Sequence, residues 1–152
     1  MKKLVFMLFA VTLLGVAFVS CGDDKDEPVI PKAQTLESEH QDATETYFKF
    51  DIDMNKDSSS IYLYNVVFTI GEAQSPAMNI RIDAPVTVDK KGKVFTYSGT
   101  DITPFLLRGN TPVPMPNMPV TDLTCTVNTG DKTYSMAFDC HGGHYSNSGK
   151  LK

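Results

Sequence analysis

The chain has 152 residues, with 14 Lys and Arg against 18 Asp and Glu, which gives a formal net charge of −4. Without residues 1–20 the chain loses Lys2 and Lys3, so 12 basic residues face 18 acidic ones and the charge becomes −6. This acidic balance, without a basic stripe, excludes a nucleic-acid-binding protein, and the roughly 110 residues of the C-terminal part are enough for one domain with one core.

The first 20 residues predict a lipoprotein signal peptide. Lys2 and Lys3 precede an apolar run over residues 4–19, and this run is shorter than the ~20 residues of a membrane-spanning helix. The string Phe18-Val19-Ser20-Cys21 resembles a lipobox, in which the cysteine takes a diacylglyceryl group and becomes the first residue after cleavage. Cys21 is therefore the predicted lipid-attachment site, and an uncleaved N-terminal anchor is the alternative.

An acidic stretch follows Cys21 directly, Gly22-Asp23-Asp24-Lys25-Asp26-Glu27. It resembles the signal with which Bacteroidota send lipoproteins to the outer face of the outer membrane. The predicted location is thus the cell envelope, as a surface-exposed outer-membrane lipoprotein. Residues 21–44 are polar and have neither helical nor strand periodicity, which predicts a lipidated, flexible acidic tether. A short helix over residues 36–40 is the alternative for its last part.

Residues 45–152 are the predicted folded domain, and their patterns are those of strands. Apolar residues alternate with polar ones over 48–54, and a β-branched and aromatic run over 61–70 indicates a central strand. Further strands are predicted over residues 78–83, 86–88, 94–97, 102–107, 123–127, 134–140 and 144–151. Prolines between 112 and 119 predict an extended segment without a regular ladder, either the rim of a ligand site or a rigid spacer.

About eight short strands with turns every 8–12 residues predict an all-β fold, either an antiparallel up-and-down barrel or a β-sandwich. The barrel is favoured because closure removes exposed sheet edges. Tyr62 and Tyr64 lie on one face of their strand, and Ile61 and Leu63 lie on the other. Because aromatic faces usually fill the interior of a small barrel, we expect the two tyrosines to point inward; lining a ligand cavity is the alternative.

Four strings resemble the calycin-like β-barrel domain of Bacteroidota lipoproteins: LYNVVFTIGEAQSPAMNIRI, ITPFLLRGNTPVP, VTDLTCTVNTGDKTYSMAFDC and HYSNSGKL. The resemblance extends over residues 60–151. It implies a lipocalin-like up-and-down barrel of about eight strands. The family has no established activity, so the resemblance implies no functional residue.

Cys125 and Cys140 lie on predicted strands on either side of the turn at Gly130 and Asp131. An exported protein meets an oxidising compartment, so a disulfide between them is one prediction. A two-residue turn would pair Cys125 with Met136 and Cys140 with Thr121, which puts the sulfurs on the order of 13 Å apart. A direct disulfide needs Cα atoms within ~7 Å, so the free, buried pair is favoured over the disulfide.

Asp51, Asp53, Asn55 and Asp57 have the spacing of the oxygen ligands that open a calcium-binding loop. Such a loop needs Gly at its sixth position and a bidentate Glu at its twelfth, where this chain has Lys56 and Tyr62. The favoured interpretation is therefore a polar turn at the solvent face of a strand, with a calcium site as the alternative.

His141 and His144 flank two glycines, and Asp139 is close to them in sequence. Two imidazoles and a carboxylate can share a metal ion, so this turn is a candidate metal site. Two histidines are too few ligands on their own, so an exposed polar turn is the favoured reading.

The sequence contains no nucleophile elbow and no phosphate-binding or dinucleotide-binding glycine pattern. We therefore expect no enzyme and no cofactor, but a binding or interaction module held at the membrane by its N-terminal lipid. Its expected partner is a small apolar ligand or an envelope protein. A structural or adhesion subunit is the second hypothesis, and a hydrolase with scattered residues is the third. A hollow interior of ~300 Å³ or more would favour an apolar ligand, and a filled interior would favour a role for the surface.

Overall fold

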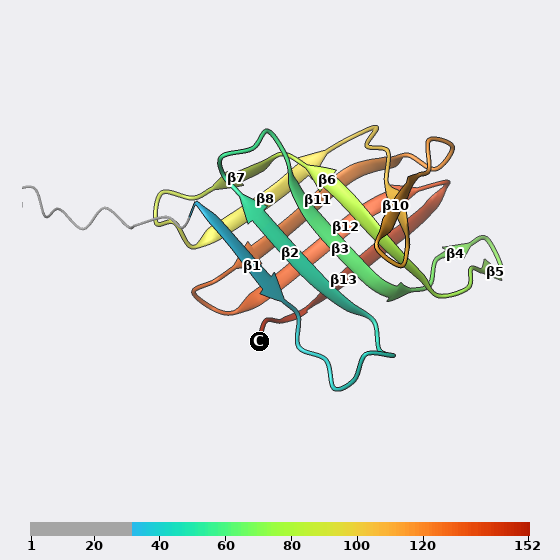
Figure 1. The fold of residues 1–152 in the computed structure, drawn as a ribbon, viewed down its shortest axis with the longest axis horizontal. Helices are drawn as coiled ribbons and strands as arrows, with labels where there is room; N and C mark the ends of the chain where they lie inside the picture. The colour runs from blue at the N-terminus through green and yellow to red at the C-terminus, as the bar shows by residue number, and fades with distance from the viewer. Residues whose placement is uncertain (1–31) are drawn as a thin grey trace, which may run out of the picture.

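The computed structural model describes residues 32–152, which form an antiparallel all-β domain without a helix in that range (Figure 1). The all-β, antiparallel class predicted from the sequence is confirmed. No helix among the described residues is long and apolar enough to cross a membrane. In chain order the strands are β1 (Ala33–Glu37), β2 (Tyr47–Asp53), β3 (Ser59–Val66), β4 (Thr69–Ile70), β5 (Ala73–Gln74), β6 (Met78–Ala84), β7 (Val86–Val88), β8 (Val94–Gly99), β9 (Phe105–Arg108), β10 (Thr111–Pro114), β11 (Val120–Asn128), β12 (Thr133–Cys140) and β13 (Gly143–Lys150).

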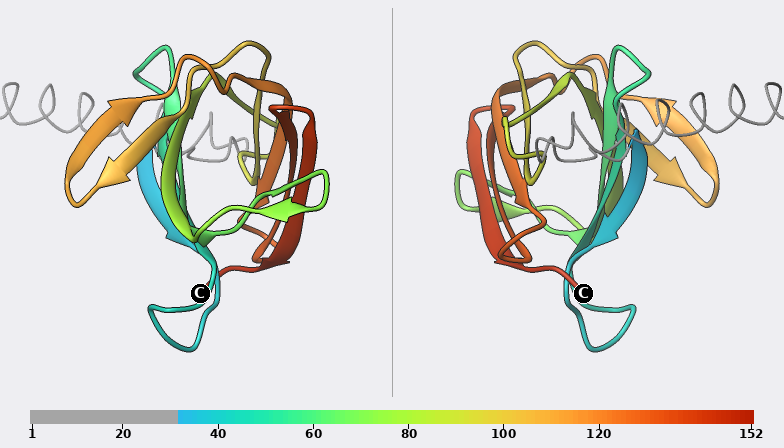
Figure 2. Two further views of the ribbon diagram at one scale, coloured as in Figure 1. Left: turned by 90° about the vertical axis from the view of Figure 1, so that its right-hand side faces the viewer. Right: turned by 90° about the vertical axis from the view of Figure 1, so that its left-hand side faces the viewer.

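Two large sheets face each other across the core (Figure 2). The first has six strands in the order β1-β2-β3-β6-β9-β10, and the second has five in the order β13-β12-β11-β8-β7. The short hairpin β4-β5 forms a third sheet near one end of β13. The ladders do not merge into one closed barrel, so the arrangement is compatible with the β-sandwich that the sequence left as the alternative.

The two large sheets are nevertheless linked on both sides. The chain passes from β6 into β7 through the single residue Pro85. On the other side Ser38 and Leu151 form an isolated antiparallel bridge. The Glu39 N–H donates to the Lys150 carbonyl at 2.8 Å, and the Lys152 N–H donates to the Glu37 carbonyl at 2.9 Å. First and last strands are therefore joined at one corner only.

The core consists of residues from both sheets that occupy matching register positions. Phe50 pairs with Ile61, which pairs with Ile82, and all three are fully buried. In the facing sheet Cys125 pairs with both Tyr97 and Met136, which are also buried. Directly paired residues share a face of a sheet, so one alternating strand fixes the inward face of its neighbours. Each large apolar side chain contributes about 1.5–3 kcal/mol by its burial.

The prediction that Tyr62 and Tyr64 fill the interior is wrong. Ile61 and Leu63 point inward and are fully buried, whereas the two tyrosines are half-buried on the outer face of the six-stranded sheet. Both faces of β3 carry large side chains, so periodicity alone does not decide which face turns toward the core. The pairing of Ile61 with Phe50 settles it, because the inward face must match that of β2.

Three predicted segments differ from the structure. Residues 33–37 form edge strand β1, although they lie in the stretch predicted as tether or short helix. The long strand predicted over 61–70 is divided, because Asn65 adopts a left-handed backbone (φ 54°) and the register with β6 shifts there. Residues 111–114 form a regular edge strand, β10, despite two prolines.

One of the two predicted strand pairings of the cysteines is observed. Cys125 pairs with Met136, as expected, but Cys140 pairs with Val120 instead of Thr121. The shift arises at Asp122, whose φ of 51° accompanies a register change between Thr121 and Thr124. Both thiols are free, and Cys125 is buried while Cys140 is half-buried. The two thiols are unpaired, as the favoured prediction has it, but only Cys125 is buried as predicted.

Candidate functional site

The outer face of the six-stranded sheet carries alternating cationic and aromatic side chains. Lys49 of β2 pairs with Tyr62 of β3, Tyr62 with Arg81 of β6, and Arg81 with Phe105 of β9. We call these four residues the outer-face row. At ~4.8 Å between neighbouring strands, the row is about 14 Å long. All four side chains are half-buried, so they present surface to solvent while the sheet fixes their positions.

A stack of aromatic rings lies beside the outer-face row. We call its members, His40, Tyr47, Tyr64 and Tyr62, the aromatic stack. The rings of Tyr47 and Tyr64 stack across β2 and β3 with centroids 4.5 Å apart, and His40 stacks on Tyr47 at 4.2 Å. The ring of Tyr62 is nearly parallel to that of Tyr64 at 6.3 Å. Stacked cross-strand pairs are worth about 0.5–1.5 kcal/mol beyond their area. The tyrosines are therefore held in place before any partner binds.

The two cations of the row are held by rings and carboxylates. The Arg81 guanidinium carbon lies 4.4 Å from the centre of the Phe105 ring, and its Nη2 is 3.1 Å from Asp83 Oδ2. The Lys49 Nζ lies 5.6 Å from the centre of the Tyr64 ring. Arg81 Nε is buried and has no hydrogen-bond partner within the described residues. This planar donor group is thus oriented by its neighbours and keeps unused hydrogen-bonding capacity.

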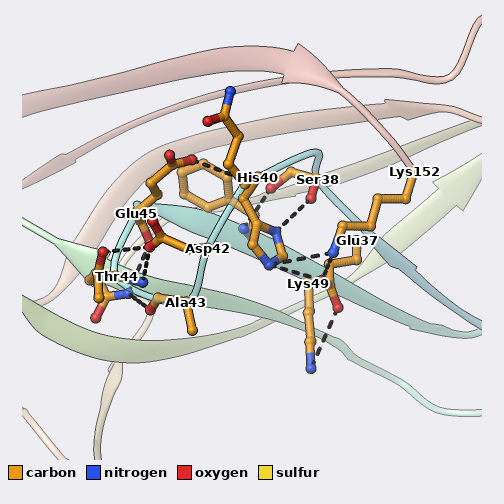
Figure 3. A network of polar contacts seen from close by, with 12 residues as sticks. Glu37, Ser38, His40, Asp42, Ala43, Thr44, Glu45, Lys49 and Lys152 are labelled. Atoms are coloured by element: carbon orange, nitrogen blue, oxygen red, sulfur yellow. Dashed lines mark hydrogen bonds and ion pairs between the residues drawn. The ribbon is translucent and has the colours of Figure 1, made fainter.

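The corner between the sheets adds a polar network around Glu37 (Figure 3). Lys152 Nζ donates to Glu37 Oε1 at 2.6 Å, and Lys49 Nζ lies 3.6 Å from Glu37 Oε2. His40 Nδ1 donates to the Ser38 carbonyl at 3.1 Å, and its Nε2 lies 3.4 Å from Lys152 Nζ and 3.5 Å from Glu37 Oε1. The hydrogen bond from Lys152 is the main reason that the pKa of Glu37 lies below its ordinary value.

A surface hollow of about 440 Å³ opens beside this network, lined by Glu39, His40, Gln41, Glu45 and Lys152. Asn65 connects the hollow to the sheet, because its Nδ2 donates to the carbonyls of Ala43 and Glu45 at 2.7 and 2.9 Å. The loop that carries His40 is therefore fixed to the bulge in β3. Ring contacts from His40 through Tyr47 and Tyr64 to Tyr62 link the hollow to the outer-face row.

Glu37→Gln is expected to lower stability at neutral pH by less than about 1 kcal/mol, because the ion pairs of Glu37 are partly exposed. The folded protein holds the pKa of Glu37 below 4.5, so the stabilising contribution is complete above that pH. It is lost as the pH falls through the folded-state pKa. Urea unfolding of both proteins at pH 7 and pH 3 should show a difference only at pH 7. An equal difference at both pH values would contradict this account.

The residues of the alternative calcium loop do not cluster as a metal site among the described residues. Asp51 accepts a hydrogen bond from Thr35 Oγ1 at 3.2 Å on the strand face. Asp53 Oδ1 accepts from the Asn55 backbone N–H and side-chain amide at 3.0 and 3.1 Å, and Asp53 Oδ2 pairs with Lys56 at 3.2 Å. Asp57 lies exposed in the same turn. Asp53 therefore organises the turn, and Asn55 acts as a donor to it instead of as a ligand.

The structure brings His144 and Asp139 together but builds no metal site from them. His144 Nδ1 lies 2.6 Å from Asp139 Oδ1, across the β12-β13 hairpin. His141 occupies the turn with a left-handed backbone (φ 50°), and Cys140 Sγ donates to the Met118 carbonyl at 3.5 Å. These residues border a surface hollow of about 660 Å³. Among residues 32–152, no three His, Cys, Asp or Glu side chains cluster as a metal site would require.

Large apolar side chains occupy the space between the sheets. The largest fully buried ones are Tyr97, Phe48, Phe50, Phe95, Phe138, Ile52, Ile61, Leu63, Ile82, Leu123, Met136 and Val66. Burial raises the pKa of Tyr145 to about 12 and that of the Cys125 thiol to about 12 as well, so neither serves as a nucleophile at neutral pH.

The predicted lipid-attachment residue, Cys21, lies outside the described residues.

Searches among protein-family models, curated proteins and solved structures find no match to this chain. The candidate site therefore rests on its geometry. Sequence reasoning missed Lys49, Arg81 and Phe105, although the alternation around Phe48 and Ile80 already places Lys49 and Arg81 on the outward face. It also missed the network around Glu37, whose partners lie at opposite ends of the domain sequence.

Proposed function

We propose that this protein is a lipid-anchored, non-enzymatic interaction module of the cell envelope that binds another envelope protein through its outer-face row. One observation carries the proposal: aromatic and cationic side chains gather outside the domain while bulky apolar residues occupy its interior. Tyr and Arg are the residues that most often dominate the energy of protein–protein binding. Their fixed rotamers lower the entropy cost of association.

The same reasoning favours a surface role over an interior ligand. A cavity for an apolar ligand needs inward positions that leave space, and here the facing positions Phe48, Phe50, Tyr97 and Met136 are filled. The exterior instead offers Tyr62, Arg81 and Phe105 in register on three strands.

We also propose that the domain is a flattened up-and-down barrel of the calycin-like type. If β6 and β7 are taken as one strand bent at Pro85, the neighbours follow chain order from β1 through β2, β3, β6/β7, β8, β11 and β12 to β13. The bridge between Ser38 and Leu151 then brings the last strand back to the first. The β9-β10 hairpin is an excursion from this order.

Photo-crosslinking in intact cells tests the interaction surface. With benzoylphenylalanine in place of Tyr62, we expect a discrete adduct with one envelope protein, identified by mass spectrometry. The same probe at Thr96, on the outer face of the five-stranded sheet, is the matched control and should give none. Adducts of equal yield at both positions, or none at either, would show that the outer-face row is not the binding surface.

Lipid anchoring is tested separately with labelled palmitate. The wild-type protein should incorporate label and remain with the membrane fraction, and Cys21→Ala should lose the label. Replacement of Cys140 by Ala leaves the proposed attachment site intact and serves as the control. Equal labelling of wild type and Cys21→Ala would overturn the lipoprotein assignment without affecting the proposal for the outer-face row.

A further inference from the structure

Three turns and the start of β1 lie at the same end of the domain (Figure 1). The turns comprise residues 53–58, 89–93 and 128–132, and residue 32 directly precedes β1. We call these four segments together the basic end. Its lysines are all exposed, and they are Lys32, Lys56, Lys90, Lys91, Lys93 and Lys132.

Backbone hydrogen bonds fix the segments of the basic end to one another. Beside the first turn, the Met54 N–H donates to the Lys32 carbonyl at 2.7 Å. Between the second and third turns, the Thr129 N–H donates to the Lys93 carbonyl at 2.8 Å. The side chain of Lys93 lies against the third turn, because a Cβ built on Gly130 would be 3.2 Å from Lys93 Cδ. The sheets and turns therefore hold the lysine backbones in place while the side chains reach solvent.

The charge of the domain is divided unevenly between the basic end and the rest. Residues 32–152 hold 11 Lys and Arg and 14 Asp and Glu, because Lys2, Lys3, Lys25 and the four acidic residues of 23–27 precede them. The basic end contains six of the 11 basic residues and four of the 14 acidic ones, so its net charge is +2. Five basic and ten acidic residues remain, so the rest of the domain carries −5.

Most carboxylates of the basic end are directed into their own turns. Asp89 Oδ1 accepts two backbone N–H groups of its turn at 2.8 and 2.9 Å. Asp131 Oδ2 accepts from Asn128 Nδ2 at 2.9 Å, and Asp53 organises the first turn as described above. By contrast, Lys56 is the only one of the six lysines with an ion-pair partner in the described part of the chain. The other five amines are open to a negatively charged partner.

The chain reaches its predicted membrane anchor from this same end. Cys21 lies 11 residues before Lys32, and a stretch of that length spans at most ~40 Å. We propose that the basic end faces the membrane and binds the phosphate groups of anionic lipids. This inference rests on the lipid anchor proposed above, to which it adds a basic patch as the second membrane contact. Each lysine close to an anionic surface strengthens such binding about five-fold.

The charge of the rest of the domain favours the same orientation. Ten acidic residues face five basic ones outside the basic end, so a domain turned the other way would be repelled by anionic lipid. Because the three turns of the basic end join strands, the strands then run away from the membrane (Figure 1). The outer-face row lies on the side of its sheet and stays open to a neighbouring envelope protein.

Acetylation of lysine amines, measured by mass spectrometry, tests this orientation. Full-length lipidated protein is purified in a neutral detergent and placed in vesicles of phosphatidylcholine, alone or with an equal part of phosphatidylglycerol. We expect Lys90, Lys91 and Lys93 to react at least about three-fold more slowly on the anionic vesicles, since headgroups cover their amines. Lys49, in the outer-face row, is the internal control and should react equally on both. In 1 M salt, where the Debye length is ~3 Å, the difference should disappear.

Substitutions at the second turn test which residues make the contact. The triple variant Lys90→Gln, Lys91→Gln and Lys93→Gln should lose the protection of Lys132 on anionic vesicles. A charge-matched control makes the same change in net charge at exposed positions away from the basic end, and it should keep the protection. Its substitutions are Gln74→Glu, Asn110→Asp and Asn117→Asp.

The outcomes separate this contact from the lipid anchor. Association with both kinds of vesicle but equal acetylation on them would overturn the contact and leave the anchor in place. Salt-sensitive protection that is already present in detergent would also overturn it, because residues 23–27 would then cover the lysines in place of lipid. Association with anionic vesicles only would support the contact without the anchor, and association with neither would contradict both.

Discussion

Phe50→Ala is expected to lower the free energy of unfolding by about 3–5 kcal/mol, the usual cost of removing a buried phenyl ring from a core. Phe50 is fully buried, pairs with Leu36 on one side and Ile61 on the other, and its ring contacts that of Tyr134 in the facing sheet at 5.3 Å between centroids. The variant therefore leaves a cavity between the two sheets. Against a total stability of about 5–15 kcal/mol, this loss brings the domain near unfolding.

Urea unfolding followed by circular dichroism measures the effect of Phe50→Ala. Phe50→Leu is the matched control, because it keeps most of the volume and should cost less than about 1.5 kcal/mol. A loss below 1.5 kcal/mol for Phe50→Ala, similar to that of Phe50→Leu, would mean that the space between the sheets closes easily. The interior would then be less tightly filled than the burial of Phe50 indicates.

The sequence predicted the strands whose two faces differ most in polarity. Over 48–53 and 78–83 one face is apolar and the other is polar or charged, so both the strand and its inward face follow from alternation. For β3 the strand was predicted but its inward face was assigned wrongly, because Ile61 and Tyr62 are both suited to a core. Which face turns inward depends on the register with β2, and the register depends on long-range pairing.

Edge strands were harder to predict because they need little apolar character. In β1 only Leu36 is a large apolar residue, and the strand forms because β2 offers a ladder from Ala33 to Glu37. The prolines in β10 predicted a break in the ladder. In an edge strand, however, the positions that lack an N–H can be those that face solvent, so the ladder to the neighbouring strand is kept. Local sequence does not show whether a strand lies at an edge, so both segments were assigned wrongly.

The candidate site was predictable in part. Alternation places Lys49 and Arg81 on the outward face, but their alignment with Tyr62 and Phe105 requires the order β2-β3-β6-β9. That order includes a non-consecutive neighbour, β9 beside β6, which no local pattern indicates. The network of Glu37 with Lys152 joins residues 115 positions apart, so it follows only from the meeting of first and last strands.

Asn65→Ala is expected to lower the free energy of unfolding by about 2–3 kcal/mol and to loosen the loop that carries His40. Alanine in a left-handed backbone costs about 1–2 kcal/mol, and Asn65 has a φ of 54°. The substitution also removes the hydrogen bonds from Asn65 Nδ2 to the Ala43 and Glu45 carbonyls. Each such bond contributes about 0.5–1.5 kcal/mol, with partly exposed ones near the low end.

Asn65→Gly separates the two contributions, because glycine adopts φ > 0 without steric cost but donates no side-chain hydrogen bond. Its expected loss in urea unfolding is about half that of Asn65→Ala. Hydrogen exchange of residues 41–46 should rise in both variants, since both release the loop from the β3 bulge. Equal losses for Ala and Gly would show that the backbone at residue 65 carries no strain. Unchanged hydrogen exchange in the loop would show instead that Asn65 does not hold His40 against Tyr47. The aromatic stack would then have to be stabilised by ring stacking alone.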